Sequence, residues 1–137
     1  MSQIVWSPIA EGVLTGKYRP GQPVPAGSRA ASKVGTGLAQ RLSSDQTLLE
    51  RVQRLRPIAE GLDLTLAQLA VAWVLHNDNV AAALVGASRP EQIASNAKAS
   101  GVELPAEALA KIDEVLGDSI IRDPELTAAN APSSRPC

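Results

Sequence analysis

The chain has 137 residues, of which 45% are hydrophobic and 20% charged, a balance typical of a single globular domain. Lysines and arginines number 13 against 14 acidic side chains, a formal net charge of −1, so the basic surplus that marks nucleic-acid binders is absent. Aromatic side chains make up only 2% of the chain, which also argues against a base-stacking surface. No nucleic-acid partner is expected.

Cysteine content and hydropathy indicate the cellular compartment of the protein and whether it spans a membrane. The one cysteine, Cys137, is the last residue, so a disulfide framework is impossible and a reduced, cytoplasmic location is expected. The N-terminus has no basic lead, and Pro8 interrupts it before a signal-type apolar core could form. The longest uncharged apolar stretch, 64–75, is shorter than the roughly 18–20 residues that cross a bilayer. The sequence predicts a soluble protein without a membrane span.

The first predicted elements are a short strand and a long loop. A β-branched and aromatic run at 3–6 predicts the strand, which ends before Pro8 because proline has no backbone donor. Residues 19–44 are rich in Pro, Gly, Ser and Thr and are interpreted as one loop. Loops beyond about 12–15 residues are uncommon in compact domains, so this one is either a functional cover or disordered.

Two amphipathic patterns predict the next helices. Asp45 is placed to cap the first, whose apolar residues recur at three- and four-residue steps as far as Ile58. Pro57 lies inside that pattern and should kink or split the helix. Residues 65–68 have the form of a capping box, which predicts a second helix that ends at 77–79.

The following segment has the pattern of a strand that leads into a helix. Residues 80–85 are a continuous apolar run, which favours a parallel strand buried on both faces. Gly86 follows, and residues 88–91 have the form of a second capping box with proline in the first turn. A helix to about Ser100 is the expected result.

The chain is predicted to finish with one more helix and a tail. Pro105 opens the helix, Gly117 closes it, and residues 118–137 are interpreted as loose. Strands that alternate with helices are typical of parallel α/β architecture. Three or more strands are normally needed for an independently stable sheet, and only two are predicted here. The sequence therefore indicates an incomplete α/β unit.

The junction between the second strand and its helix is the first candidate for chemistry. Free backbone N–H groups and the positive end of a helix dipole attract phosphate at such a junction. Gly86 allows close approach of the backbone, Ser88 offers a hydroxyl, and Arg89 offers a planar fork of donors. The alternative is that Ser88 only caps the helix and Arg89 points to water.

The segment at 7–18 is the second candidate. Gly12, Gly16 and Lys17 superficially suggest a Walker loop, which needs four residues between the glycines and Ser or Thr after the lysine. Three residues intervene here and Tyr18 follows, so this motif is rejected, and a GxGxxG fingerprint is also absent. Lys17 is either a point charge for a phosphate or a lysine that faces solvent.

Other catalytic arrangements find no support in the sequence. His76 is the sole histidine and is interpreted as a helix-end residue near the negative end of the dipole. With Cys137 in the predicted tail, no zinc cluster or Cys–His pair can be assembled, and no metal is predicted. No spacing indicates a Ser–His–Asp triad or a pair of catalytic carboxylates. Trp73 is expected in the core.

Three segments, in order, resemble the aldo-keto reductase family. Residues 6–18, Trp-Ser-Pro-Ile-Ala-Glu-Gly-Val-Leu-Thr-Gly-Lys-Tyr, are similar to the segment at strand seven of that family's barrel. Residues 66–75 resemble the helix that follows it, and residues 85–93 with Asn96 resemble the adenine-nucleotide signature at strand eight. The similarity covers about residues 3–118, nearly the whole chain except its tail.

The resemblance implies an α/β fold, the C-terminal fragment of a (β/α)₈ TIM barrel with the last two βα units and the C-terminal helix. Such barrels typically need about 250 residues, more than this chain has. Residues 1–118 would form the cofactor-binding part and residues 119–137 a flexible tail. The Trp-Ser-Pro form and the loop ending in Ser28 and Arg29 are most similar to the branch that includes potassium-channel β subunits and bacterial relatives.

The resemblance also implies NADP(H) as the cofactor and gives its contacts. Trp6 would lie against the nicotinamide ring, and Lys17 and Arg29 would clamp phosphates from the long loop. Ser88 and Arg89 would hold the 2′-phosphate. The ribose and pyrophosphate path would be lined by Ser7, Pro8, Ile9, Ala10, Glu11 and Gly12. The second strand's loop and helix would contribute Gly86 beside the phosphate, and Gln92 and Asn96 near the adenine.

The implied activity is that of an NADP(H)-dependent oxidoreductase that reduces aldehydes and ketones to alcohols. The family's catalytic Asp, Tyr, Lys and His belong to earlier strands, so no catalytic residue is assigned, and Tyr18 and Lys17 are not their counterparts. The pocket for the small carbonyl substrate would come mostly from loops outside this chain. Two alternatives stay open. One is a nucleotide-binding regulatory subunit of the channel β type, with a channel partner that no segment here encodes. The other is an inactive fragment.

Overall fold

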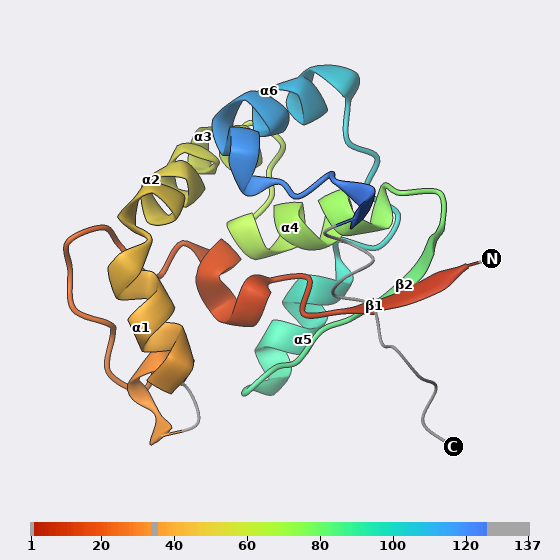
Figure 1. The fold of residues 1–137 in the computed structure, drawn as a ribbon. Helices are drawn as coiled ribbons and strands as arrows, with labels where there is room; N and C mark the ends of the chain where they lie inside the picture. The colour runs from red at the N-terminus through yellow and green to blue at the C-terminus, as the bar shows by residue number, and fades with distance from the viewer. Residues whose placement is uncertain (1, 34–35, 126–137) are drawn as a thin grey trace.

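The computed structural model describes residues 2–33 and 36–125 (Figure 1). Within these ranges the chain forms two strands and six α-helices. The strands and helices in chain order are β1 (Gln3–Trp6), α1 (Thr36–Ser44), α2 (Gln46–Arg54), α3 (Arg56–Glu60), α4 (Leu66–Leu75), β2 (Val80–Leu84), α5 (Pro90–Ala97) and α6 (Ala106–Leu116). The 3₁₀ segments of the described chain include η1 (Ala10–Thr15), η2 (Arg29–Ala31) and η4 (Gly117–Ser119). The expected α/β character is confirmed.

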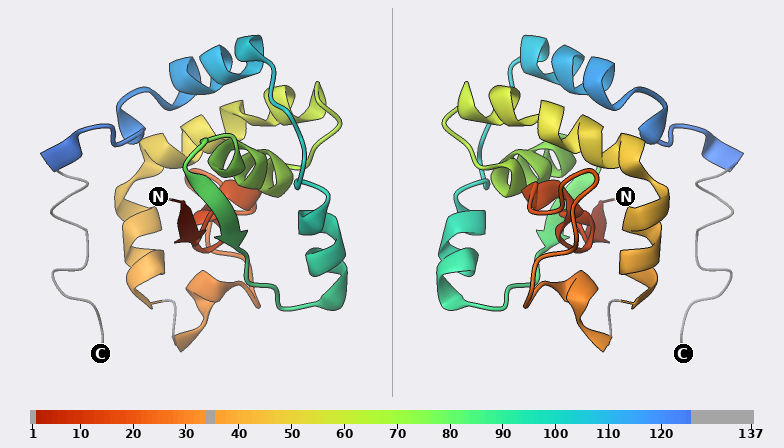
Figure 2. Two further views of the ribbon diagram at one scale, coloured as in Figure 1. Left: turned by 90° about the vertical axis from the view of Figure 1, so that its right-hand side faces the viewer. Right: turned by 90° about the vertical axis from the view of Figure 1, so that its left-hand side faces the viewer.

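The two strands lie side by side and run in the same direction (Figure 2). Trp6 is the register partner of Leu84, and Val5 is the partner of Ala83. Both strands therefore end at the same edge of the sheet, and the segments that follow them leave from adjacent positions. The helix α4, which precedes β2 in the chain, packs against that strand.

One face of the sheet stays open to solvent. Ile4, Trp6 and Leu84 are 67%, 80% and 61% exposed, and alternate residues of a strand lie on the same face. The prediction that β2 is buried on both faces is therefore wrong, because its apolar run meets α4 on one side while Leu84 remains exposed. A continuous apolar run is the signal for a strand of a larger parallel sheet, and within residues 2–33 and 36–125 the sheet has two strands.

The hydrophobic core lies among the helices. Val52 on α2 and Ala72 on α4 are completely buried, and α6 packs across α2 and α3, as the upper part of Figure 1 shows. Trp73 is partly buried and packs against this core. The buried apolar residues of the helices that make up the cluster include Leu38, Leu42, Leu49, Val52, Leu55, Ala59, Leu66, Leu69, Val71, Ala72 and Ile112.

The predicted helix starts at Asp45 and Thr65 are confirmed. Asp45 accepts a hydrogen bond from the backbone N–H of Leu48 at 2.9 Å and caps α2. The predicted break near Pro57 is present, since α2 ends at Arg54 and α3 begins at Arg56. Thr65 and Gln68 exchange the two reciprocal hydrogen bonds of a capping box, at 3.1 and 2.9 Å.

The segment interpreted as one long loop contains helical structure. Residues 29–31 form η2 and residues 36–44 form α1, so the prediction of a loop over 19–44 is wrong for these parts. Leu38 and Leu42 lie one turn apart on α1, and both are buried. This tertiary packing outweighs the weak intrinsic helix propensity of the glycine and serines in α1.

Contacts hold the first residues beyond α6. Arg51 on α2 donates hydrogen bonds to the backbone oxygen of Leu116 at 2.8 Å and to the hydroxyl of Ser119 at 2.5 Å, and it pairs with Asp118. Residues 126–137, with Cys137, lie outside the described residues. The division of the chain at residue 118 stays a prediction.

Candidate functional site

The candidate site lies at the sheet edge where both strands end. Trp6 and Leu84 are the last register pair of the sheet. The chain continues from β1 into residues 7–18 and from β2 into residues 85–89. These are the two segments that the sequence predicts to bind phosphate. Residues 7–18 with Arg29 are the first half-site of the candidate site, and residues 86–96 are the second half-site. The parallel register therefore brings the start of both predicted half-sites to one place.

The turn after β1 holds an unusual run of left-handed backbone. The φ angles are 55° at Ser7, 47° at Ala10, 57° at Glu11 and 96° at Gly12. Each such conformation at a residue other than glycine costs about 1–3 kcal/mol, and such residues cluster at functional sites. Hydrogen bonds within the turn stabilise it, among them the N–H of Ala10 to the oxygen of Ser7 at 2.8 Å.

Lys17 is folded back onto this turn. Its amine lies 5.1 Å from the centre of the Tyr18 ring, within range of a cation–π interaction. A Cβ atom at Gly12 would come within 3.0 Å of the same amine. Glycine at position 12 therefore provides the backbone conformation and the space for the Lys17 side chain, which sits against the turn.

Tyr18 anchors the loop that carries the second candidate cation. Its side chain is only 2% exposed, and its hydroxyl accepts a hydrogen bond from the N–H of Ala30 at 3.3 Å. Its backbone oxygen accepts another from the amide of Gln53 at 3.2 Å. Sequence reasoning did not assign Tyr18 this positioning role, although it is the only tyrosine in a chain poor in aromatic residues.

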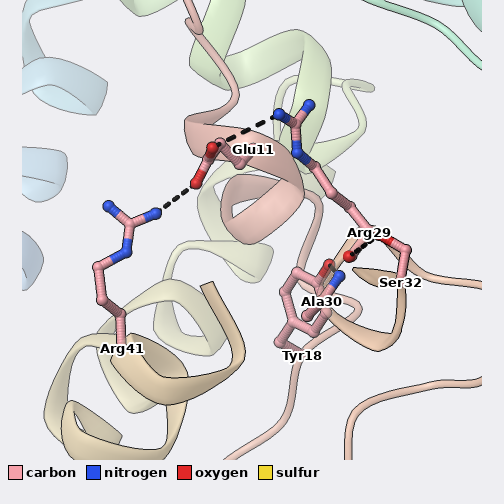
Figure 3. A network of polar contacts seen from close by, with 6 residues as sticks. All are labelled: Glu11, Tyr18, Arg29, Ala30, Ser32 and Arg41. Atoms are coloured by element: carbon pink, nitrogen blue, oxygen red, sulfur yellow. Dashed lines mark hydrogen bonds and ion pairs between the residues drawn. The ribbon is translucent and has the colours of Figure 1, made fainter. Parts of the chain in front are cut away.

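Glu11 lies between two arginines, as Figure 3 shows. Arg29 of η2 approaches one carboxylate oxygen at 3.6 Å, and Arg41 of α1 is hydrogen-bonded to the other. Arg41 is a site residue that sequence reasoning missed, because residues 36–44 were interpreted as loop. The spacing of Leu38 and Leu42 was the signal that could have placed Arg41 on a helix.

Ser28 precedes Arg29 and carries an unpaired polar atom. It is 8% exposed, and its hydroxyl has no hydrogen-bond partner within residues 2–33 and 36–125. Buried polar atoms are nearly always hydrogen-bonded, so an orphaned hydroxyl requires an explanation. A ligand with acceptor oxygens beside Arg29 would supply one.

The second half-site is organised by Gln92. Its side-chain oxygen accepts hydrogen bonds from the N–H of Ser88 at 2.9 Å, the hydroxyl of Ser88 at 3.1 Å and the N–H of Arg89 at 3.2 Å. The prediction of a capping box with Ser88 as the N-cap residue and Glu91 as its partner is wrong. Arg89 is the N-cap residue, and Ser88 donates hydrogen bonds to Gln92. Gln92, three residues after the cap, is the residue that can reach back.

The remaining predicted residues have separate positions. Gly86 and Arg89 are exposed, and the guanidinium of Arg89 has no ion pair in the described part of the chain. Asn96 is half-buried on α5, one turn after Gln92 and therefore on the same face of the helix. Pro8 is buried, and Ile9 is partly buried against the core.

A hollow of about 550 Å³ adjoins the first half-site. Residues from the end of β1 and from the following turn line one side of it, and residues of α1 line the other. These lining residues include Trp6, Ser7, Ala10, Glu11, Leu38, Arg41 and Leu42. Trp6 and Glu11, both predicted site residues, therefore border one cavity.

Comparison with known proteins identifies the family. Residues 1–117 match the family model described as the aldo/keto reductase family. The chain belongs to this family. The resemblance inferred from the three sequence segments is thus confirmed.

The relatives include proteins named as channel subunits. The chain is 45% identical over 116 residues to a Schizosaccharomyces pombe protein, and 46% identical over 113 residues to proteins of Arabidopsis thaliana and Oryza sativa subsp. japonica. All three carry names that place them among voltage-gated potassium channel β subunits. The matches cover 81–82% of this chain and 33–34% of the relatives, so the chain spans about a third of their length.

A solved structure shares the fold. The glycerol dehydrogenase of Gluconobacter oxydans matches with a TM-score of 0.63 at 22% identity, over 90% of this chain and 37% of that one. At this identity the likeness shows the fold alone. This α/β chain therefore has the backbone arrangement of part of that structure. Within its described residues, no helix is long and apolar enough to span a membrane, and no group of His, Cys, Asp or Glu could hold a metal ion.

Proposed function

We propose that this chain is the NADP(H)-binding portion of an aldo/keto reductase that reduces aldehydes and ketones to alcohols. The observation that carries the proposal is the shared sheet edge from which both half-sites begin. Lys17 and Arg29 follow β1, and Arg89 follows β2. A dinucleotide phosphate ligand presents several negative charges along its length, and cations on two neighbouring loops suit such a ligand.

The residues present fit this cofactor. Ser28 has a buried hydroxyl without a partner directly beside Arg29, and both would contact phosphate oxygens together with Lys17. Ser88 and Arg89 would hold the 2′-phosphate, and the side-chain oxygen of Gln92 accepts hydrogen bonds from the backbone N–H groups of both residues. When bound, the nicotinamide supplies the hydride for carbonyl reduction. Trp6, 80% exposed at the end of β1, offers an aromatic face for that ring.

The remaining contacts complete the proposed cofactor path. The turn residues Ser7, Pro8, Ile9, Ala10, Glu11 and Gly12 would line the ribose and pyrophosphate, Gly86 would let the backbone approach the phosphate, and Gln92 and Asn96 would lie near the adenine. The left-handed conformations at positions 7 and 10–12 support this role, since strained backbone concentrates at binding sites.

The proton donor for the reaction is expected outside this chain. Tyr18 is only 2% exposed, so its hydroxyl does not suit proton transfer to a bound carbonyl. His76 is exposed at the C-terminal end of α4, away from the sheet edge that carries the half-sites. The chain spans about a third of its relatives, and the remaining two thirds would supply the acid and the carbonyl pocket.

A second candidate function rests on the names of the relatives. Proteins at 45–46% identity are named as potassium-channel β subunits, which favours a regulatory role in which a bound dinucleotide affects a partner protein. The two candidates share the cofactor site and differ in the consequence of binding. Carbonyl turnover distinguishes them.

The test joins this chain to the preceding part of its Schizosaccharomyces pombe relative. NADPH oxidation is then measured with a panel of aldehydes and ketones, and NADPH affinity is measured separately. We expect binding and carbonyl-dependent oxidation. Binding without turnover over the whole panel would favour the regulatory candidate. Failure to bind NADPH in a folded fusion would contradict the proposal.

A further inference from the structure

The carboxylate of Glu11 lies where the proposed function expects an anionic ligand. The turn that holds it would line the pyrophosphate path, and a negative side chain there repels phosphate. Figure 3 shows its position between the guanidinium groups of Arg29 and Arg41. We propose that Glu11 competes with the anionic ligand for Arg29, and that Arg41 limits this competition by neutralising Glu11. The inference rests on the proposed cofactor site and assigns an affinity-determining role within it.

The two arginines hold Glu11 unequally. The distance from Arg29 Nη2 to Glu11 Oε1 is 3.6 Å, which is an ion pair but longer than a hydrogen bond. Arg41 Nη2 donates a hydrogen bond to Oε2 of the same carboxylate. Arg29 is therefore the more loosely held partner by distance, although both arginine side chains are exposed. A phosphate, which accepts from a guanidinium in bidentate geometry, can take Arg29 while the pair with Arg41 stays closed.

The backbone does not by itself favour glutamate at position 11. Its φ and ψ of 57° and 23° lie in the left-handed region, which Gly, Asn and Asp adopt more readily than Glu. The neighbouring turn fixes this conformation through the hydrogen bond from the N–H of Gly12 to the oxygen of Ile9 at 3.0 Å. The carboxylate is thus presented from a fixed turn to arginines on two other elements, η2 and α1.

Arg41 is a positioning residue in this arrangement. It is held on α1, whose Leu38 and Leu42 are buried in the core, and within the described residues its side chain pairs with Glu11 and with neither Lys17 nor Arg29. Without Arg41, the full charge of Glu11 would act on Arg29 and on an arriving phosphate. Removing Arg41 should therefore weaken anion binding only while Glu11 carries its charge.

The experiment is a double-mutant cycle on the full chain. Wild type, Glu11→Gln, Arg41→Gln and the double variant are titrated calorimetrically with NADPH, and with inorganic pyrophosphate as a minimal anion. Glu114→Gln on α6 and Arg54→Gln on α2 make the same charge changes at exposed positions for which the structure gives no ion pair. They control for net charge. Far-UV circular dichroism checks folding, and Glu11→Asn, which tolerates positive φ, replaces Glu11→Gln should that variant unfold.

We expect Glu11→Gln to lower the Kd for both probes about two- to fivefold, the range of an exposed ion pair, and Arg41→Gln to raise it by a similar factor. Arg41→Gln should have no further effect when Glu11 is already neutral. If the wild type binds neither probe and Glu11→Gln binds at least one, that result would also support the proposal. An unchanged or raised Kd for Glu11→Gln, with the wild type binding, overturns the inference and leaves the proposed function intact. If Arg41→Gln raises the Kd by the same factor in the wild type and in Glu11→Gln, Arg41 does not act through Glu11 and that part of the inference is overturned. If no variant binds either probe, both proposals fail for this chain.

Discussion

The hydroxyl of Tyr18 accepts a hydrogen bond from the backbone N–H of Ala30 at 3.3 Å, across twelve positions of the chain. Both residues are buried, at 2% and 5% exposure. This bond fixes η2, and with it the backbone of Arg29, against the turn that holds Lys17. One buried phenol therefore positions two of the three candidate phosphate-binding cations.

Replacing Tyr18 with phenylalanine should destabilise the protein by about 1–3 kcal/mol, the cost of leaving a buried N–H unsatisfied. The ring and its packing remain, so the change reports on the hydroxyl. Urea denaturation measures the free energy of unfolding. Ser43→Ala removes an exposed hydroxyl from α1 and serves as the control, with an expected change within about 0.5 kcal/mol. A Tyr18→Phe variant as stable as the control would show that the link to Ala30 contributes nothing.

Gly12→Ala should be more destabilising than the matched change Gly21→Ala. Both glycines have positive φ, 96° and 67°, so each substitution strains the backbone by about 1–2 kcal/mol. Only at Gly12 does the new Cβ meet another group, the Lys17 side chain at 3.0 Å, whereas nothing lies within 4 Å at Gly21. The difference between the two thermal midpoints combines the displacement of Lys17 with the greater backbone strain at Gly12, whose φ of 96° lies beyond the left-handed region that Gly21 occupies. Equal midpoints would mean that Lys17 does not occupy this space.

The pKa of the Asp118 carboxyl is lowered from its ordinary value of 3.8, first by a hydrogen bond from Arg51 and then by the charge of that arginine. A group with a lower pKa in the folded state contributes stability above its unfolded pKa, and this contribution is lost as pH falls through the folded pKa. Asp118→Asn should therefore lower the thermal midpoint at neutral pH, and the deficit should vanish in strong acid.

Thermal denaturation from pH 7 down to about pH 2, below the usual range of an aspartate, measures this deficit. Glu114→Gln removes an exposed carboxylate on α6 that forms no ion pair within the described residues, and it controls for the loss of one negative charge. A deficit for Asp118→Asn that stays the same at every pH would argue against the ion pair and for a packing defect.

The helix starts could be predicted because their signals are local. Asp45 and Thr65 accept hydrogen bonds from N–H groups three residues ahead, so a few letters of sequence contain both partners. A proline lacks the backbone N–H that a helix interior needs, so Pro57 lies in the first turn of a new helix, α3. By contrast, α1 forms because Leu38 and Leu42 pack into a core made by distant helices, and its own residues are weak helix formers.

In the candidate site, too, features with a local sequence signal could be predicted and features made by distant residues could not. Gly86 to Arg89 were recognisable because a strand, a glycine and a helix start follow one another in sequence. The Glu11–Arg41 pair joins residues thirty positions apart through a helix that was not predicted, so no local pattern contains it. The acceptor role of Gln92 was missed because the second cap was placed one residue too early, at Ser88 in place of Arg89.

Arg89→Ala should reduce the preference for NADPH over NADH. Only NADPH carries the 2′-phosphate, and the loss of a hydrogen bond to a charged group costs about 1.5–3 kcal/mol, or roughly one to two powers of ten in Kd. Affinity for NADH should change little. Arg54→Ala on α2 removes the same charge at an exposed position that is not among the proposed cofactor contacts, and it serves as the control. An unchanged ratio of the two affinities would place the 2′-phosphate elsewhere.

The most direct test of the cofactor site is a titration of the purified chain with NADPH, followed by tryptophan fluorescence, with NADH in parallel. Trp6 is 80% exposed at the end of β1, whereas Trp73 packs against the core, so a Trp6→Phe variant assigns the signal. Saturable quenching that is stronger with NADPH, and that is lost in Trp6→Phe, is the predicted result. Fluorescence of a folded chain that stays unchanged with both dinucleotides would contradict a cofactor site at this sheet edge.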